Sequence, residues 1–171
     1  IKDLLAYLRV LTNPEDDSAF LRIVNTPRRE IGPATLQKLG EWANLRSKSL
    51  FHASFDVGLG QTLSGRGLEH LQRFTHWLNE IIQLTEREPV NAVRDLIRGI
   101  DYESWLFETS GSPKAAEMRM KNVNTLFQWM TEMLEGSDID EPMTLAQVVT
   151  RFTLRDMMER GESDEELDQV Q

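Results

Sequence analysis

Cysteine is absent from this 171-residue chain. Its absence excludes disulfides, thiolate metal sites and cysteine nucleophiles, and it suits a protein of a reducing cytosol. No apolar run approaches the roughly 20 residues that a membrane-spanning helix needs, and no signal peptide is visible. Histidine is scarce, and His70 and His76 are six positions apart, so a helix would place them on different faces. We therefore expect neither a membrane span nor a metal site.

Catalytic motifs are also lacking, although two segments come close to one. Residues 60–67 have the glycine spacing of a P-loop, but Arg66 and Gly67 stand where that loop needs a lysine and a serine or threonine. The acidic run 164–166 is similar to the acidic pair of ATPases, yet it lies in a solvated tail instead of at the end of a buried strand. We expect no catalytic residue and no bound cofactor in this chain.

Positive charge is in short supply, and it is unevenly distributed. The formal net charge is −9; residues 1–81 carry ten Lys or Arg and nine Asp or Glu, whereas residues 82–171 carry nine and nineteen. The second half should therefore repel DNA except where Lys114, Arg119 and Lys121 cluster, and a solvated helix face is the favoured interpretation of that cluster. Any contact with phosphate should come mainly from the first half.

Helical periodicity is abundant. Leu4, Leu8 and Leu11 form an apolar stripe at helical spacing, and similar stripes, with Met118 and Leu154 among their members, recur along the chain. No window shows the alternation typical of a strand, and the four tryptophans fall on expected helices, where core packing is favoured over base stacking. The sequence predicts an all-α, compact multi-helix domain of about eight or nine helices, with residues 1–171 as a single unit. The expected helices lie at about residues 4–11, 17–24, 33–46, 50–56, 67–86, 89–100, 102–107, 114–134 and 144–160.

The connections between these helices carry the usual helix-start and turn residues. Asp16 or Asp17 can cap the second helix. Residues 58–67 should form a flexible glycine-rich connector with Ser64 as a helix cap, and residues 136–142 should form an acidic loop.

The two ends of the chain suggest that it belongs to something larger. The sequence begins at Ile1 within a helical pattern and stops at Gln171 without a stop signal. Residues 161–171 are expected to be a mobile, largely acidic tail. We therefore expect a piece of a longer protein.

One segment combines a helix end, a basic tight turn and a new helix start. Residues 25–27 should end a helix, because a residue before proline is pushed out of the α region, and Gly32 with Pro33 should open the next one. The glycine lets the backbone approach a ligand closely, and the free amides after Pro33, together with the helix dipole, favour a phosphate there. Positive charge is supplied by Arg28, Arg29 and Lys38. The segment indicates either a helix-hairpin-helix-like contact to a DNA backbone, independent of base sequence, or a simple helical corner with its arginines in solvent.

A second corner repeats this theme more weakly. In residues 63–68, Gly65 and Arg66 again stand at a helix start, after Ser64. From the residues alone, a plain linker is somewhat favoured for this segment.

Several segments resemble the Rep-type (Rep/UvrD/PcrA) superfamily 1A DNA helicases. Residues 1–9, IKDLLAYLR, are similar to the I-K-D-x-x-A-Y-L-R segment that follows the ATPase half of these enzymes, and residues 25–35 are similar to their N-x-P-x-R-x-I-G-x-x-T stretch. The corner at residues 65–66 fits as well, and residues 168–171, DQVQ, are similar to the sequence that leads into a helicase motif. The resemblance covers essentially the whole chain.

The resemblance implies that the chain is the helical 2B subdomain of an ATP-dependent 3′-to-5′ DNA helicase and translocase of the bacterial cytoplasm, active in DNA replication and restart. This subdomain would be inserted in the second RecA-like domain, joined to it by two hinges, and would swivel as a rigid body and regulate unwinding. ATP and Mg²⁺ would bind between RecA-like domains outside this chain. The partners would be duplex or junction DNA and the remaining domains of the parent helicase.

The two corners and the resemblance together nominate a set of DNA-binding residues. The family's corner is often Gly-Ile-Gly, whereas here Glu30 replaces the first glycine, which predicts that the chain alone binds DNA poorly, as does its net charge. A second hypothesis is an acidic all-helical protein–protein interaction module in which the first corner is purely structural. The nominated residues are Arg28, Arg29, Ile31, Gly32, Thr35, Lys38, Ser64, Gly65 and Arg66.

Overall fold

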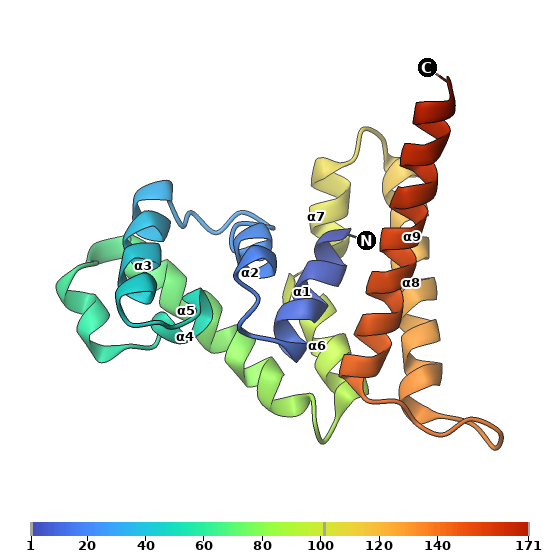
Figure 1. The fold of residues 1–171 in the computed structure, drawn as a ribbon, viewed down its shortest axis with the longest axis horizontal. Helices are drawn as coiled ribbons and strands as arrows, with labels where there is room; N and C mark the ends of the chain where they lie inside the picture. Colours follow the sequence, from blue (N-terminus) through green and yellow to red (C-terminus); the bar gives the residue numbers. More distant parts are fainter. Residues whose placement is uncertain (1, 101, 171) are drawn as a thin grey trace.

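The computed structural model describes the backbone of residues 2–100 and 102–170, and the side chains of all of these except 102–104, 107 and 162–170. Within that part of the chain, helices are the only regular secondary structure, which confirms the predicted all-α class. Figure 1 shows the long helix α5 crossing the molecule from the end occupied by α3 and α4 to α6. The helices are α1 (Lys2–Thr12), α2 (Asp17–Ile23), α3 (Pro33–Leu45), α4 (Leu50–Ala53), the 3-10 helix η1 (Val57–Gln61), α5 (Gly65–Leu84), α6 (Pro89–Ile100), α7 (Tyr102–Thr109), α8 (Pro113–Glu135) and α9 (Leu145–Val170).

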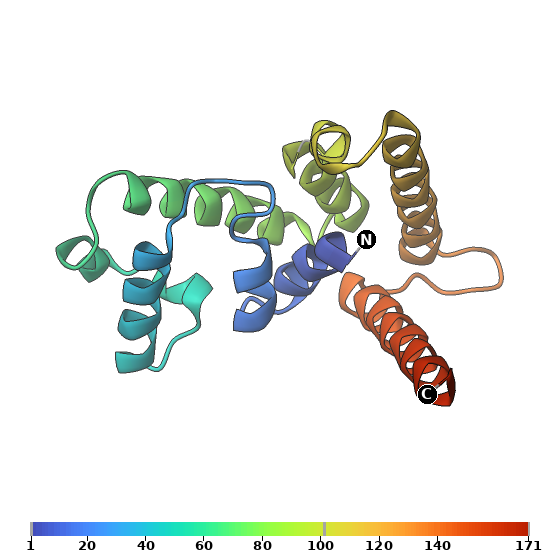
Figure 2. The ribbon, with the colours of Figure 1, turned by 90° about the horizontal axis from the view of Figure 1, so that it is seen from above.

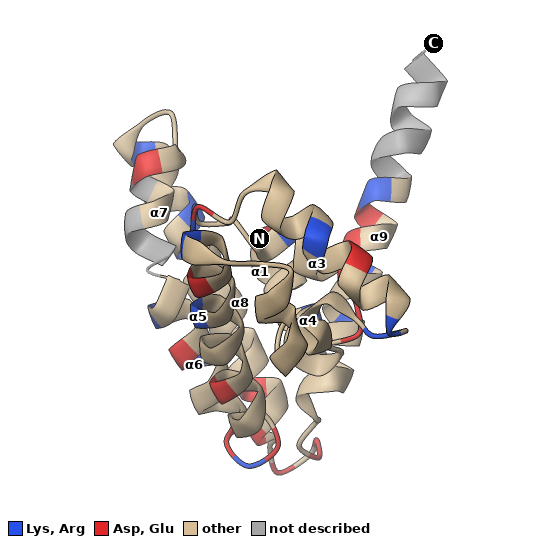
Figure 3. Ribbon diagram, turned by 90° about the vertical axis from the view of Figure 1, so that its left-hand side faces the viewer, with Lys and Arg blue, Asp and Glu red and all other residues tan. Residues whose placement is uncertain are grey.

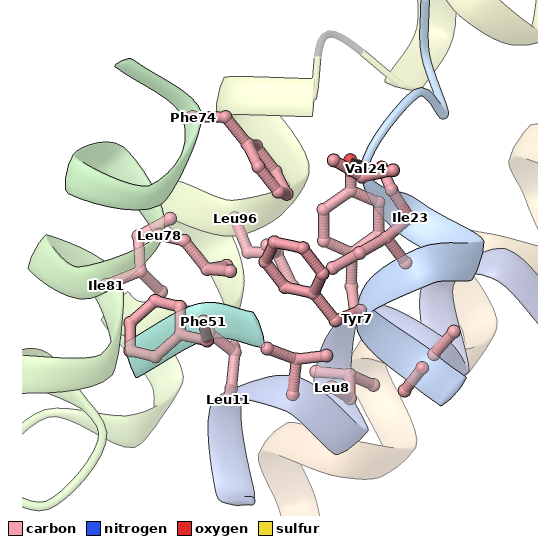
Figure 4. Close-up of a cluster of buried hydrophobic side chains, with 14 of the residues drawn as sticks. Tyr7, Leu8, Leu11, Ile23, Val24, Phe51, Phe74, Leu78, Ile81 and Leu96 are labelled. Atoms are coloured by element: carbon pink, nitrogen blue, oxygen red, sulfur yellow. Dashed lines mark hydrogen bonds between the residues drawn. The ribbon is translucent and has the colours of Figure 1, made fainter. Parts of the chain in front are cut away.

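The first helix forms the centre of the core. Leucine, valine, alanine and tyrosine side chains are buried around most of the circumference of α1, which is typical of a helix enclosed by others. It packs against α2, α5 and α9. Figure 4 shows Tyr7 and Leu8 of α1 among side chains from α2, α5 and α6, including Ile23, Phe74 and Leu96.

Local capping signals set several of the helix starts. The carboxylate of Asp16 accepts a hydrogen bond from the Ala19 amide at 3.0 Å, which confirms the predicted cap of α2. The Ser112 hydroxyl caps α8 in the same way, accepting from the Ala115 amide at 3.1 Å. Ser64 occupies the cap position of α5, but its hydroxyl accepts no hydrogen bond from that helix.

The region between α4 and α5 differs from the predicted flexible connector. Residues 57–61 form a 3-10 helix, and Leu59 is fully buried. The ring of Trp42 lies so close to Gly58 that a Cβ built there would be 2.8 Å from it. The backbone is thus packed against α3, and this packing replaces a free linker.

Three other expectations about helices were wrong. Met118 and Leu154, predicted as core residues, have exposed fractions of 62% and 56%. The last helix continues past residue 160 to Val170, and Figure 1 shows its end extending beyond the neighbouring α8. Helical spacing predicts which face of a helix is apolar, but a partner helix must also reach that position to bury it.

Candidate nucleic-acid interface

The turn between α2 and α3 is a fixed bend held by its own side chains. The amide nitrogen of the Asn25 side chain donates to the Ile31 carbonyl at 2.7 Å, and the Asn25 side-chain oxygen accepts from the Ile31 amide at 3.0 Å. Ile31 itself is 2% exposed and packs in the core. Its side chain therefore does not lie on the surface that a ligand could touch, although it was nominated as a DNA-binding residue.

Arg29 points into this bend. One guanidinium nitrogen donates to the Ile23 carbonyl at 2.8 Å and reaches the carbonyls of Val24, Thr26 and Pro27 at 3.3 Å each. The other donates to the Tyr7 hydroxyl, which in turn donates to the Thr26 carbonyl. These bonds tie the guanidinium to carbonyls at the end of α2 and in the turn that follows it. The structure thus gives Arg29 an internal role, whereas its neighbour Arg28 is exposed.

The same arrangement shifts the pKa of the Tyr7 hydroxyl. Burial raises the pKa of the Tyr7 hydroxyl above 10.0, and the nearby guanidinium of Arg29 opposes part of that rise. The phenol is therefore held neutral, so that it can both accept from Arg29 and donate to a carbonyl.

Glu30 adopts a backbone conformation that favours glycine. Its φ is +61°, in the left-handed region that L-residues other than Asn and Asp seldom enter. The helicases that this sequence resembles often carry the first glycine of a Gly-Ile-Gly corner at this position. The bend thus keeps the shape that a glycine would give, at the cost of strain and of a carboxylate beside the arginines.

Two helices begin at this end of the molecule without side-chain caps. The cap position of α3 is Gly32, which has no side chain to offer, and Pro33 follows it. The first helical hydrogen bond there runs from the Leu36 amide to the Gly32 carbonyl at 3.1 Å, so the amides of the preceding turn have no helical partner. The start of α5 likewise lacks a side-chain cap. Both termini therefore present free amides and the positive end of a helix dipole.

A close approach between Gly67 and Thr35 brings these two helix starts together. A Cβ built on Gly67 would lie 2.3 Å from the Thr35 hydroxyl oxygen, so a larger residue would clash with the Thr35 side chain as the structure places it. Figure 2 shows the segment after α2 running along α5 before it enters α3, and the His70 ring nitrogen lies 3.4 Å from the Glu30 carbonyl oxygen. The two corners nominated separately from the sequence thus form one surface.

We call this the corner surface; it comprises the nominated residues that remain accessible. Most of them are exposed, whereas Gly32 and Thr35 are half-buried. Figure 3 shows basic positions on α3 and around the start of α5. The corner surface consists of Arg28, Gly32, Thr35, Lys38, Ser64, Gly65 and Arg66.

The later basic cluster lies apart from this arrangement. Lys114, Arg119 and Lys121 are exposed on α8, as expected for a solvated face. The start of α8 is already capped by Ser112, and Arg119 donates to the Ser110 hydroxyl at 3.2 Å. Nothing in the described part of the chain groups three or more His, Asp or Glu side chains as a metal site would, and none of the described helices is long and apolar enough to cross a membrane.

Comparison with known proteins gives the chain its family. Residues 1–171 match the family described as the UvrD-like helicase C-terminal domain. The chain belongs to this family. It is 83% identical over 171 residues to the ATP-dependent DNA helicase Rep of Escherichia coli (strain K12) and, at the same identity, to that of Salmonella typhimurium (strain LT2). The match covers 100% of this chain and 25% of each relative.

A more distant member of the family shares the whole segment. The DNA helicase II of Escherichia coli (strain K12) is 29% identical over 171 residues, which are 100% of this chain and 23% of that protein. The chain thus spans about a quarter of the length of the curated relatives it matches.

Proposed function

We propose that this chain is the helical 2B subdomain of an ATP-dependent 3′-to-5′ DNA helicase, and that its corner surface contacts the backbone of duplex DNA. The observation that carries the proposal is the Gly67–Thr35 approach, which sets two uncapped helix starts side by side. Family membership supports it, since the two relatives that are 83% identical over the whole chain are named ATP-dependent DNA helicases.

The chemistry of the corner surface suits phosphate groups and carries no sequence information. Backbone amides and helix dipoles attract an anion, and Arg28, Lys38 and Arg66 add mobile positive charges around them. A contact of this kind would hold a duplex of any sequence, as a translocating motor requires.

The acidic second half of the chain does not prevent such a contact. At about 0.1 M salt, charges more than about 10 Å apart are largely screened. The net charge of −9 therefore weakens long-range attraction but leaves short-range phosphate contacts in place. We expect binding by the isolated chain to be weak, and the contact to form when the rest of the protein holds DNA nearby.

The salt dependence of duplex binding tests this proposal. We would measure the affinity of the full-length protein for a blunt duplex by fluorescence anisotropy at a series of salt concentrations, without nucleotide. The slope of log K against log salt is negative, and Arg28→Ala, Lys38→Ala and Arg66→Ala should each lower its magnitude by about 1, because each removes one phosphate contact. Arg87→Ala, an exposed charge just beyond the far end of α5, is the matched control. If the three corner variants keep the wild-type slope, as the control should, the proposed contact is wrong.

We further propose that the subdomain regulates unwinding in replication and restart. Family membership supports this role as well, since the relatives that match the whole chain are named DNA helicases. The test is the unwinding rate of the full-length protein compared with a variant in which residues 2–170 are replaced by a short flexible linker. An unchanged rate would contradict a regulatory role.

An acidic protein-interaction module remains the second candidate, and one observation favours it. Trp129, Met157 and Met158, on α8 and α9, have exposed fractions of 44%, 61% and 68%, and exposed apolar groups of this kind are common in protein interfaces. Loss of a protein partner on Met157→Ser with Met158→Ser, together with unchanged duplex binding in the corner variants, would favour this candidate.

A further inference from the structure

A cavity of about 440 Å³ opens beside the corner surface. It lies where the bend between α2 and α3 meets α5 and the end of α6. Its walls combine positively charged side chains with aromatic ones, and one lining residue carries a carboxylate. The lining residues are Arg28, Arg29, Glu30, His70, Arg73, Phe74, Trp77 and Gly99.

Arg28 and Arg73, two of the lining arginines, form no ion pair with any residue that the structure describes. Among the ion pairs of the described residues, Arg9, Arg22 and Arg46 each lie within 4.0 Å of an aspartate oxygen, whereas neither Arg28 nor Arg73 takes part in any pair. Both side chains are exposed at the rim. Their charge is therefore available to an anion that enters the cavity.

The aromatic walls offer little surface for stacking a base. The face of the Phe74 ring is covered by the Arg29 guanidinium, whose carbon lies 4.3 Å from the ring centre. The indole of Trp77 packs against Gly99, where a Cβ would be 2.5 Å from the ring. Since these faces are occupied, the chemistry that remains is that of the arginines and of His70, which favours a phosphate over a nucleobase.

The cavity also continues a basic face of α5 that starts at the corner surface. Arg66, His70 and Arg73 are spaced four and three residues apart, so they lie along one side of the helix. From Arg66 to Arg73 the helix rises about 10 Å, which is the rise of about three nucleotides of one DNA strand. A strand that rests on the corner surface can therefore reach the cavity without leaving this helix face.

We infer that the cavity is a second phosphate subsite, in which Arg28 and Arg73, with His70 beside them, bind a backbone phosphate of the DNA held on the corner surface. The inference rests on the proposed function and extends it to a residue, Arg73, that no sequence motif singles out. It also gives Gly99 a role, because any side chain there would clash with the ring of Trp77, which lines the cavity.

The test is a salt series with Arg73 variants of the full-length protein and a blunt duplex. Arg73→Ala should weaken binding and lower the magnitude of the negative slope of log K against log salt by about 1. Arg73→Lys, which keeps the charge, should retain the slope, and Arg87→Ala should match the wild type. Thermal unfolding of each variant checks that the fold is intact, as expected for an exposed side chain; should Arg73→Ala unfold, Arg73→Gln takes its place.

The outcomes separate this inference from the proposal on which it rests. If Arg66→Ala and Lys38→Ala lower the slope but Arg73→Ala does not, the corner surface binds DNA and the cavity does not. If none of the variants lowers the slope, the proposed function itself fails, and the inference fails with it. If Arg73→Ala leaves the slope unchanged but abolishes binding of a poly-glutamate peptide, the cavity serves an acidic protein segment and the inference is overturned.

Discussion

The guanidinium carbon of Arg29 lies 4.3 Å from the centre of the Phe74 ring, so an arginine of the bend is stacked on an aromatic residue of α5. A cation above an aromatic face is stabilised by the ring quadrupole, and the same guanidinium bonds to the carbonyls at the end of α2. The bend is thereby fixed against both α1 and α5. This contact distinguishes the two neighbouring arginines: Arg29 stabilises the bend from inside, whereas Arg28 lies on the corner surface.

We predict that Arg29→Ala destabilises the fold by about 2 kcal/mol, since it removes charged hydrogen bonds to partly buried carbonyls and a cation–π contact. Arg28→Ala should change stability by less than about 0.5 kcal/mol, as is usual for exposed positions. Urea unfolding followed by circular dichroism measures both. Equal stability of the two variants would contradict the internal role of Arg29. Arg29 would then again be a candidate phosphate-binding residue.

Glu30 provides a test that separates strain from charge. Glu30→Gly should stabilise the chain by about 1 kcal/mol, because glycine adopts a positive φ without steric cost. Glu30→Ala removes the same carboxylate but keeps a Cβ in the left-handed region, so it should give no such gain. Both variants should bind duplex DNA more tightly than the wild type. If Glu30→Ala is as stable as Glu30→Gly, the positive φ at residue 30 does not strain the backbone.

Gly67 and Thr35 form a pair suited to a double-mutant cycle. Gly67→Ala forces a Cβ against the Thr35 hydroxyl, and overpacking of this kind typically costs about 1–3 kcal/mol. In a Thr35→Ala background the clash with the hydroxyl is removed, and the better helix propensity of alanine should make the same change neutral or favourable. Unfolding free energies of the four proteins give the coupling, which we expect to be at least about 0.5 kcal/mol; additive effects would show that α3 and α5 do not meet at this point.

The raised pKa of Tyr7 makes a prediction about alkaline stability. Folded Tyr7 holds its proton above the pH at which the unfolded residue, with a pKa near 10.0, releases it. The contribution of Tyr7 to stability is therefore complete below pH 10 and falls as the pH rises from there towards the folded pKa. Tyr7→Phe should remove this part of the alkaline loss, so the difference in unfolding free energy between wild type and variant should shrink above pH 10. A constant difference would contradict the burial of the hydroxyl.

The sequence predicted what depends on neighbours in the chain. The Asp16 cap requires only an amide three residues away, and Pro33 marks the start of α3 through its own ring geometry, so both were evident before the structure was known. The orientation of Arg29 depends on Tyr7 and Phe74, 22 residues before it and 45 after it. No local pattern distinguishes an arginine that bonds inwards from one that faces solvent, and both were nominated alike.

Tertiary packing also decided which nominated residues share a surface. The sequence contained two separate glycine-containing corners, and contacts such as the one between Gly67 and Thr35 join them. Arg73 was missed, although its spacing from Arg66 and His70 was visible, because a basic residue on an exposed helix face is usually just solvated. Ile31 was nominated because it lies within the motif, but its side chain is buried and its backbone amide and carbonyl bond to Asn25.

Site-specific photocrosslinking tests the central claim most directly. A photoreactive amino acid would replace Ala34 on α3, Ser64 at the start of α5 or, as a control, Ile139, which is 93% exposed in the acidic loop. In the full-length protein bound to a forked duplex, we predict crosslinks to the double-stranded region from positions 34 and 64 and none from position 139. Crosslinks from 34 and 64 no stronger than those from 139 would contradict the account.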